Sequence, residues 1–144
     1  MFNLFTKKKS NNKIKENNEL LSKTASLLIH AAKIDEKYSN KEKEIIKKIL
    51  IELGVKKIDI NKVMIDAEIN EDKANQILDF TREIKNTNHA FKTKIIEALW
   101  KIIYSDEEAD MYEASLMRRL AGLLYIDRKT MGDIKVKIKN DLNR

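Results

Sequence analysis

The sequence of 144 residues contains no cysteine and no proline, and it has only three glycines and one tryptophan. Without cysteine the chain can form neither disulfides nor thiolate metal sites, and it has no cysteine nucleophile. Sheet-rich domains need many tight turns and use more glycine and proline to build them. Lys, Glu, Leu, Ile and Ala are abundant instead, so the composition predicts an all-helical protein.

Long apolar runs and catalytic motifs are also missing. No segment approaches the roughly 20 apolar residues of a membrane span, and the amino terminus lacks the apolar core of a signal peptide. The chain has no P-loop, dinucleotide-binding or hydrolase glycine motif, and neither His30 nor His89 has a nucleophile or second histidine at useful spacing. We therefore expect a cytoplasmic, non-enzymatic protein that acts through protein partners.

The net charge of +6 is concentrated at the two ends of the chain. Residues 1–18 carry five lysines and one glutamate, and residues 128–144 carry six basic and two acidic residues, so each end has a net charge of +4. Residues 19–127 carry 18 basic and 20 acidic residues, a net charge of −2. Because the basic charge lies outside this central part, the composition does not support nucleic-acid binding.

Residues 1–18 allow two interpretations. They combine the apolar residues of Met1 to Phe5 with a run of lysines. The segment is either a flexible basic lead-in or a weak tether to an anionic membrane surface, which would make the protein peripheral to the membrane.

Apolar periodicity predicts one compact bundle of about seven helices over residues 19–140, followed by a short tail at 141–144. We expect a first helix over 19–34 and a second that begins after Ser39, with Glu42 at capping-box spacing, and ends at Gly54. Further helices are expected after Asp59, from residues 70–72 (with Leu78 on its apolar face), over 90–104 as a central helix, from 111 to about 125, and after Asp127.

Two acidic stretches, at residues 35–42 and 106–113, share a pattern at an offset of 71 residues. Three pairs of polar positions align, and so do the apolar positions of the helix that follows. The aligned residues are Asp35 with Asp106, Ser39 with Asp110, Glu42 with Glu113, Ile45 with Leu116, Ile46 with Met117, and Ile49 with Leu120. We interpret them as two copies of a helix–acidic turn–helix unit, packed as a pseudo-symmetric bundle.

The acids of these stretches have two explanations. Residues at the starts of helices satisfy free amides and interact favourably with the helix dipole, by roughly 0.5–1 kcal/mol each. Capping does not explain Asp35 and Asp106, which stand four residues before each cap, where the preceding helix ends and its dipole disfavours an acid. The alternative is a site for Ca²⁺ or Mg²⁺, since both ions prefer carboxylate and backbone oxygens. Neither stretch has the ligand spacing or turn glycine of an EF-hand.

Four segments resemble a known family, the tellurite-resistance TerB family, whose superfamily includes the amino-terminal domain of the DjlA co-chaperone. They are LDFTREI at 78–84, IEALWKIIYSD at 96–106, DMYE at 110–113 and RRLAGLL at 118–124. The resemblance covers residues 20–140 and implies a single helical domain of about seven helices, associated with stress or tellurite responses.

The resemblance also implies a set of cation ligands. In that family the turn acids have been proposed as a divalent-cation site, and by position the ligands here would be Asp35, Glu42, Asp106, Asp110 and Glu113. The chain departs from the family at Glu36 and Glu107, where the family commonly has glycine after each turn aspartate.

Overall fold

The computed structural model describes residues 19–33, 38–73, 77–104 and 111–142, with residues 111–114 described by their backbone only. All regular structure within these ranges is helical. After a helix at residues 19–33 come α2 (Asn40–Leu53), α3 (Ile60–Lys73), α4 (Leu78–Ile84), α5 (His89–Tyr104), α6 (Met111–Leu123) and α7 (Arg128–Leu142). The predicted all-helical bundle of about seven helices is confirmed.

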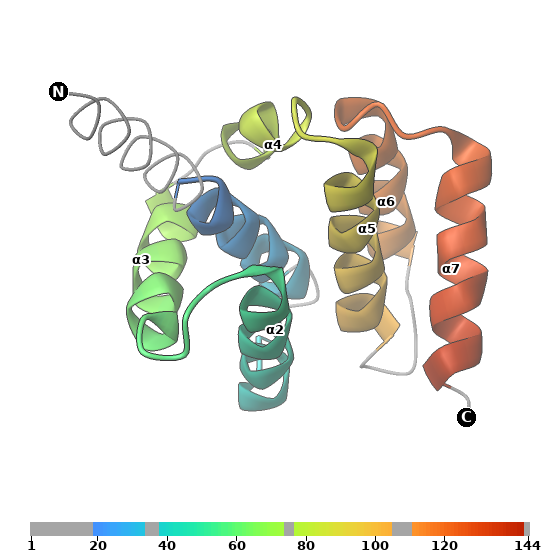
Figure 1. The fold of residues 1–144 in the computed structure, drawn as a ribbon. Coiled ribbons are helices and arrows are strands. Elements are labelled where there is room, and N and C mark those ends of the chain that lie inside the picture. The colour runs from blue at the N-terminus through green and yellow to red at the C-terminus, as the bar shows by residue number, and fades with distance from the viewer. Residues whose placement is uncertain (1–18, 34–37, 74–76, 105–110, 143–144) are drawn as a thin grey trace, which may run out of the picture.

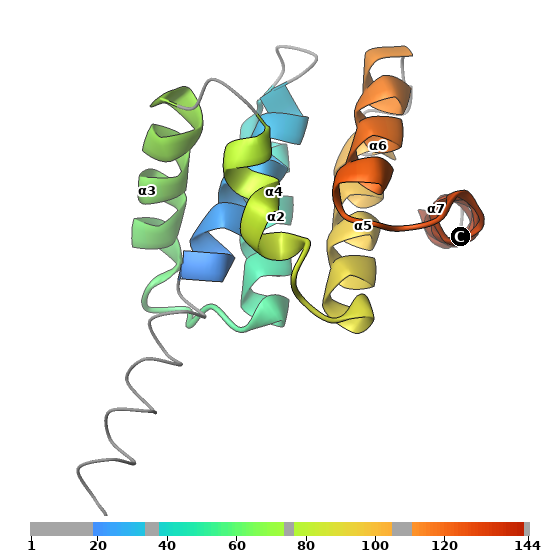
Figure 2. The ribbon, with the colours of Figure 1, turned by 90° about the horizontal axis from the view of Figure 1, so that it is seen from above.

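The helices pack side by side in a wide bundle (Figures 1 and 2). α3 lies at one edge and α7 at the opposite edge, while α4 crosses one end of the bundle near the start of α5. Helix 19–33, α2, α5 and α6 occupy the middle. None of the helices that the structure describes is long and apolar enough to cross a membrane.

Two helices supply much of the core. As predicted, α5 is buried on most of its circumference, with seven buried side chains from Ile95 to Ile103. Helix 19–33 is buried even more completely, because every residue from Thr24 to Ile29 is at most 1% exposed. Each large apolar side chain that these helices remove from water stabilises the fold by roughly 1.5–3 kcal/mol.

The buried part of helix 19–33 includes two hydroxyl groups, those of Thr24 and Ser26, and the apolar pattern did not predict the burial of Ser26. Ser26 Oγ donates a hydrogen bond to the backbone oxygen of Ala67 in α3 (3.1 Å), and Thr24 Oγ1 donates to the backbone oxygen of Leu20 (2.8 Å). Because both hydroxyls are bonded to backbone oxygens, they can be buried without a large desolvation cost. The small Ser26 side chain thereby joins this helix to α3.

The predicted ends of α2 are confirmed. Ser39 is its N-cap, and Gly54 follows its last residue with φ +124°. Asp127 likewise begins α7, since its Oδ1 accepts a hydrogen bond from the Thr130 backbone N–H (3.1 Å). Asn88, whose role the sequence did not reveal, caps α5 by accepting from the Phe91 N–H (2.8 Å).

The predicted helix start at residues 70–72 is wrong. These residues lie inside α3, which continues to Lys73, and the next helix, α4, begins only at Leu78. Leu78 is 38% exposed, and the buried aromatic side chain of α4 is that of Phe80. Asn70 and Asp72 resemble N-cap residues locally, but Glu71 between them forms an ion pair with Lys33 of helix 19–33, which favours continuation of α3.

α2 and α6 match each other at the offset of 71 residues. They begin at the equivalent residues Asn40 and Met111. They also end alike. Gly54 and its equivalent Tyr125 both have positive φ. The backbone N–H of the next residue donates a hydrogen bond to the helix in each case, from Val55 to the Leu50 oxygen and from Ile126 to the Ala121 oxygen (both 2.9 Å). This is the hydrogen bond of a Schellman-type helix end. The pseudo-symmetry of the complete units stays a prediction.

Candidate metal site

Of the five predicted ligands, Glu42 alone has a described side chain. Asp35, Asp106 and Asp110 lie outside the described residues, and Glu113 lies in the first turn of α6, where the structure describes the backbone only. The surroundings of the first stretch can be built from the side chains next to it.

Glu42 is a buried acid at the start of α2, only 3% exposed. Ser39 Oγ accepts a hydrogen bond from the Glu42 backbone N–H (3.3 Å), and the same hydroxyl lies 3.3 Å from Glu42 Oε1, to which it can donate. The Ser39 side chain thus serves as the N-cap that its position in the sequence predicted. The positive end of the α2 dipole also favours the Glu42 carboxylate in its charged form.

Two further carboxylates, those of Glu68 and Glu71 in α3, lie near the Tyr38 side chain at the start of α2. Tyr38 O–H donates a hydrogen bond to Glu68 Oε1 (3.0 Å). Burial raises the pKa of Tyr38, and the hydrogen bond to Glu68 and the negative charges of Glu68, Glu42 and Glu71 raise this pKa further. The Tyr38 phenol therefore lies in the field of three carboxylates and stays protonated at neutral pH.

Basic side chains partly neutralise the carboxylates of α3. Lys33 Nζ lies 2.7 Å from Glu71 Oε2, and His30 Nδ1 lies 3.3 Å from Glu71 Oε1. Lys43 Nζ lies 3.7 Å from Glu68 Oε1 and 5.0 Å from the centre of the Tyr38 ring. These contacts join α3 to helix 19–33 and α2, so they have a structural role whatever else this region does.

The sequence interpretation missed Glu68 and Glu71. No motif marks them, because they come from a helix about 30 to 40 positions further along the chain. The one available signal is their spacing of three residues, which places both on one face of α3.

The described residues do not complete a cation site by themselves. Among them, no group of three or more histidine, aspartate or glutamate side chains is arranged to hold a metal ion. Glu68 and Glu71 already have basic partners, so a cation here would need ligands from Glu42 together with residues 34–37. The Glu42 carboxylate suits such an ion, because carboxylate oxygen is a preferred ligand of Ca²⁺ and Mg²⁺.

In Figure 1, α2 begins and α5 ends toward the lower end of the bundle, whereas α6 begins higher up. α4, in contrast, lies across the upper end.

Comparisons with known proteins bear on the identity of this fold. A family model described as tellurite resistance protein TerB matches residues 21–136. No curated protein and no solved structure matches the chain. The matched region contains helix 19–33 from residue 21 onward, all of α2 to α6, and most of α7, together with both acidic stretches. The chain therefore belongs to the TerB family of tellurite resistance proteins.

Proposed function

We propose that this chain is a non-enzymatic TerB-type module that binds a divalent cation, Ca²⁺ or Mg²⁺, through its acidic turns. In this proposal the module acts in the cytoplasm through protein partners, in a stress response of the tellurite-resistance type. The observation that carries the proposal is the buried carboxylate of Glu42 at the first acidic turn. Membership of the TerB family supports the proposal in general terms.

The electrostatics around Glu42 favour a cation. Hydrogen bonds and positive charge favour a buried carboxylate, and Glu42 already has the Ser39 hydroxyl 3.3 Å from its Oε1. Near Glu42, the negative charges of Glu68 and Glu71 contribute to the same field. A divalent cation held by Glu42 and Asp35 would lower the repulsion among these groups, and it would explain an aspartate at a position where capping offers no reason for one.

The surface of α3 supports the involvement of protein partners. Ile65 and Ile69 stand one turn apart on α3 and are 58% and 46% exposed, and Ile58 shortly before α3 is 88% exposed. Exposed apolar side chains that share a helix face are a common feature of protein interfaces. If no cation binds, the chain is better explained as a purely structural interaction domain whose turn acids only cap helices.

Calorimetric titration with Ca²⁺, Mg²⁺ and Mn²⁺ tests the proposal. We expect saturable heat and a higher melting temperature for the wild-type chain, since an ion that binds only the folded state stabilises it. Asp35→Asn and Asp106→Asn should each lower the affinity for the cation by about tenfold or more, so the rise in melting temperature should be smaller. Asp133→Asn, at an exposed aspartate of α7, is the matched control and should behave like the wild type.

Two results would reject the cation proposal. One is the absence of both heat and any change in melting temperature with all three ions. The other is equal binding by the wild type, Asp35→Asn and Asp106→Asn, because the ion would then bind elsewhere on the surface.

A further inference from the structure

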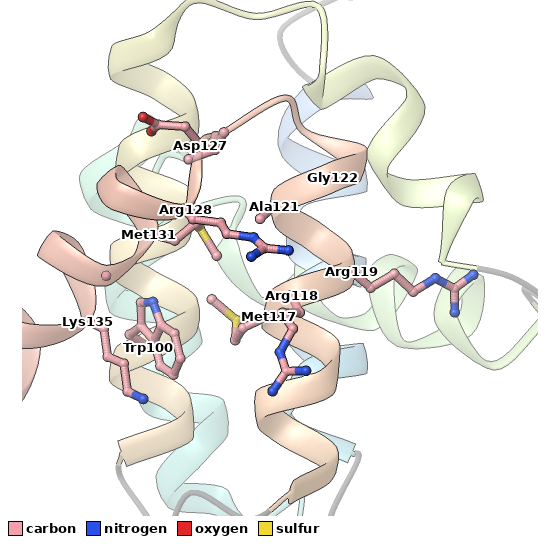
Figure 3. A pocket seen from close by; sticks show the side chains of 12 residues that line it. Trp100, Met117, Arg118, Arg119, Ala121, Gly122, Asp127, Arg128, Met131 and Lys135 are labelled. Carbon is pink, nitrogen blue, oxygen red and sulfur yellow. The ribbon is translucent and has the colours of Figure 1, made fainter.

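The helices α5, α6 and α7 line an open pocket with a volume of about 830 Å³ (Figure 3). Ligand sites typically occupy roughly 300 to 1,000 Å³. The pocket lies at the edge of the bundle formed by α7, whereas α3, with the carboxylates described above, forms the opposite edge. It is therefore separate from the candidate metal site around Glu42.

Two of the three glycines of the chain form part of the pocket wall. They are Gly122 in α6 and Gly132 in α7, and an added Cβ at either position would meet no atom within 4 Å. Glycine destabilises a helix interior relative to alanine. Neither glycine is required by positive φ, so what these two residues provide is open space between α6 and α7.

The inner surface of the pocket is apolar. Trp100 from α5 lies at its base, with Met117 from α6, Met131 from α7 and Ile126 from the connection between them. Figure 3 shows the side chains of Met117 and Met131 extending toward each other across the pocket. Methionine side chains adapt their shape readily to an apolar ligand.

The polar groups of the pocket are mainly donors and cations. Trp100 is 5% exposed, and its Nε1 is buried, so this N–H does not face the open part of the pocket. Lys135 Nζ lies 5.4 Å from the centre of the Trp100 ring. Arg118 and Arg128 also line the pocket, and Arg128 extends from α7 toward α6 in Figure 3, whereas Arg119 points away.

Asp127, the acidic residue among those that line the pocket, already has a hydrogen-bond partner. Asp127 is exposed, and its Oδ1 accepts the hydrogen bond from the Thr130 N–H that begins α7. A ligand that satisfies the remaining polar groups must therefore supply acceptors and negative charge, while the apolar inner surface requires an apolar body.

We propose that this pocket binds an amphipathic carboxylate, namely a medium- or long-chain fatty acid. The hydrocarbon chain packs against Trp100, Met117 and Met131. The carboxylate binds the Arg128 guanidinium, which extends toward α6, through charge-assisted hydrogen bonds, and Lys135 beside the Trp100 ring adds positive charge to the pocket. This site needs no cation, so the test of the pocket is independent of the test of the metal site.

Trp100 makes the proposal directly measurable. It is the single tryptophan of the chain, so its fluorescence reports on this pocket alone. We expect dodecanoate, kept below its micelle-forming concentration, to change the Trp100 emission with a saturable curve. Dodecyltrimethylammonium, with the same chain length and the opposite charge, should bind about tenfold more weakly or worse.

Variants separate a specific site from general adsorption of a surfactant. Arg128→Gln should weaken dodecanoate binding by about tenfold, and Lys135→Gln should weaken it by less. Lys129→Gln and Lys139→Gln change exposed residues of α7 that do not line the pocket, and they should bind like the wild type. Gly132→Leu should narrow the pocket and weaken dodecanoate binding, with circular dichroism to verify that this variant folds.

Three results would overturn the proposal. The first is no saturable response of Trp100 to dodecanoate. The second is equal binding of dodecanoate and dodecyltrimethylammonium. The third is wild-type affinity in both Arg128→Gln and Lys135→Gln, since the anionic head would then not be bound in this pocket.

Discussion

Lys33 Nζ lies 2.7 Å from Oε2 of Glu71, and this ion pair joins helix 19–33 to the last turn of α3. The Glu71 side chain is only 9% exposed, and its other oxygen faces His30 Nδ1. The hydrogen bond and the negative charge of Glu71 raise the pKa of Lys33 above its usual value. Glu71 thus holds two helices together at a point where the local sequence resembles a helix start.

Removal of the Glu71 charge should destabilise the fold. We expect Glu71→Gln to lower the free energy of unfolding by roughly 1–2 kcal/mol, because Lys33 loses its charged partner and the charge-assisted hydrogen bond between them, while the partial exposure of Lys33 to water limits the cost. Urea denaturation measures this change. Glu44→Gln is the control, since Glu44 pairs with Lys47 at an exposed position of α2, and its loss should cost less than about 0.5 kcal/mol. Equal effects of the two substitutions would contradict the assigned role of Glu71.

The fold should lose stability in alkaline solution. The pKa of Lys33 is raised from 10.5 mainly by its hydrogen bond to Glu71, and burial and Glu68 raise the pKa of Tyr38 from 10.0. Both groups hold their protons more tightly in the folded chain, so their contribution is complete below the unfolded-state values and is lost as pH rises through the folded-state values.

Urea denaturation at a series of pH values checks this expectation. The free energy of unfolding should fall as pH increases above about 10. Tyr38→Phe should reduce the slope, because the phenylalanine has no proton to lose. An identical slope in the wild type and in Tyr38→Phe would show that Tyr38 does not contribute.

The same substitution should have opposite effects at two glycines. Gly54→Ala places a side chain where φ is +124° and should cost about 1 kcal/mol or more of stability. Gly132→Ala lies within α7, where an added Cβ meets open space, and should stabilise the protein by roughly 0.5–1 kcal/mol. Thermal and urea denaturation of both variants measure the difference, and a change of the same sign at both positions would contradict the assigned backbone roles.

A membrane tether at residues 1–18 predicts a charge-dependent association with vesicles. The full chain should co-sediment with vesicles that contain anionic lipid, and deletion of residues 1–18 should abolish most of that binding. Vesicles of neutral lipid are the control and should retain little protein in either case. Equal sedimentation of the full and shortened chains would remove the tether hypothesis.

Local signals in the sequence predicted the helix ends most successfully. Ser39, Gly54 and Asp127 all lie at the predicted ends, because a cap depends on residues within one turn of it. The same kind of signal failed at residues 70–72, where Glu71 contacts a helix that lies almost 40 positions earlier. Tyr125 also escaped prediction, since its positive φ of 56° occurs at a residue type that rarely adopts it.

The candidate metal site could be predicted only in part. The acidic pattern led to Glu42, and the structure shows that this carboxylate is buried. Glu68 and Glu71 reach the same region through the packing of α3 and carry no signal in the local sequence. No pattern in the sequence indicated the pocket at Trp100 either, because the pocket forms between three helices that meet only in the folded chain.

The sequence by itself determined the all-helical class, the caps of α2 and α7, the acidic repeat and the resemblance to the TerB family. Helix propensity and capping are interactions among neighbours along the chain, so they can be read without the fold. Only the tertiary structure decided that Ser26 and Glu42 are buried, that α3 continues to Lys73, and that α5, α6 and α7 leave a pocket at Trp100. The physical reason is that burial, ion pairing and cavity shape depend on contacts between helices that are distant in the sequence.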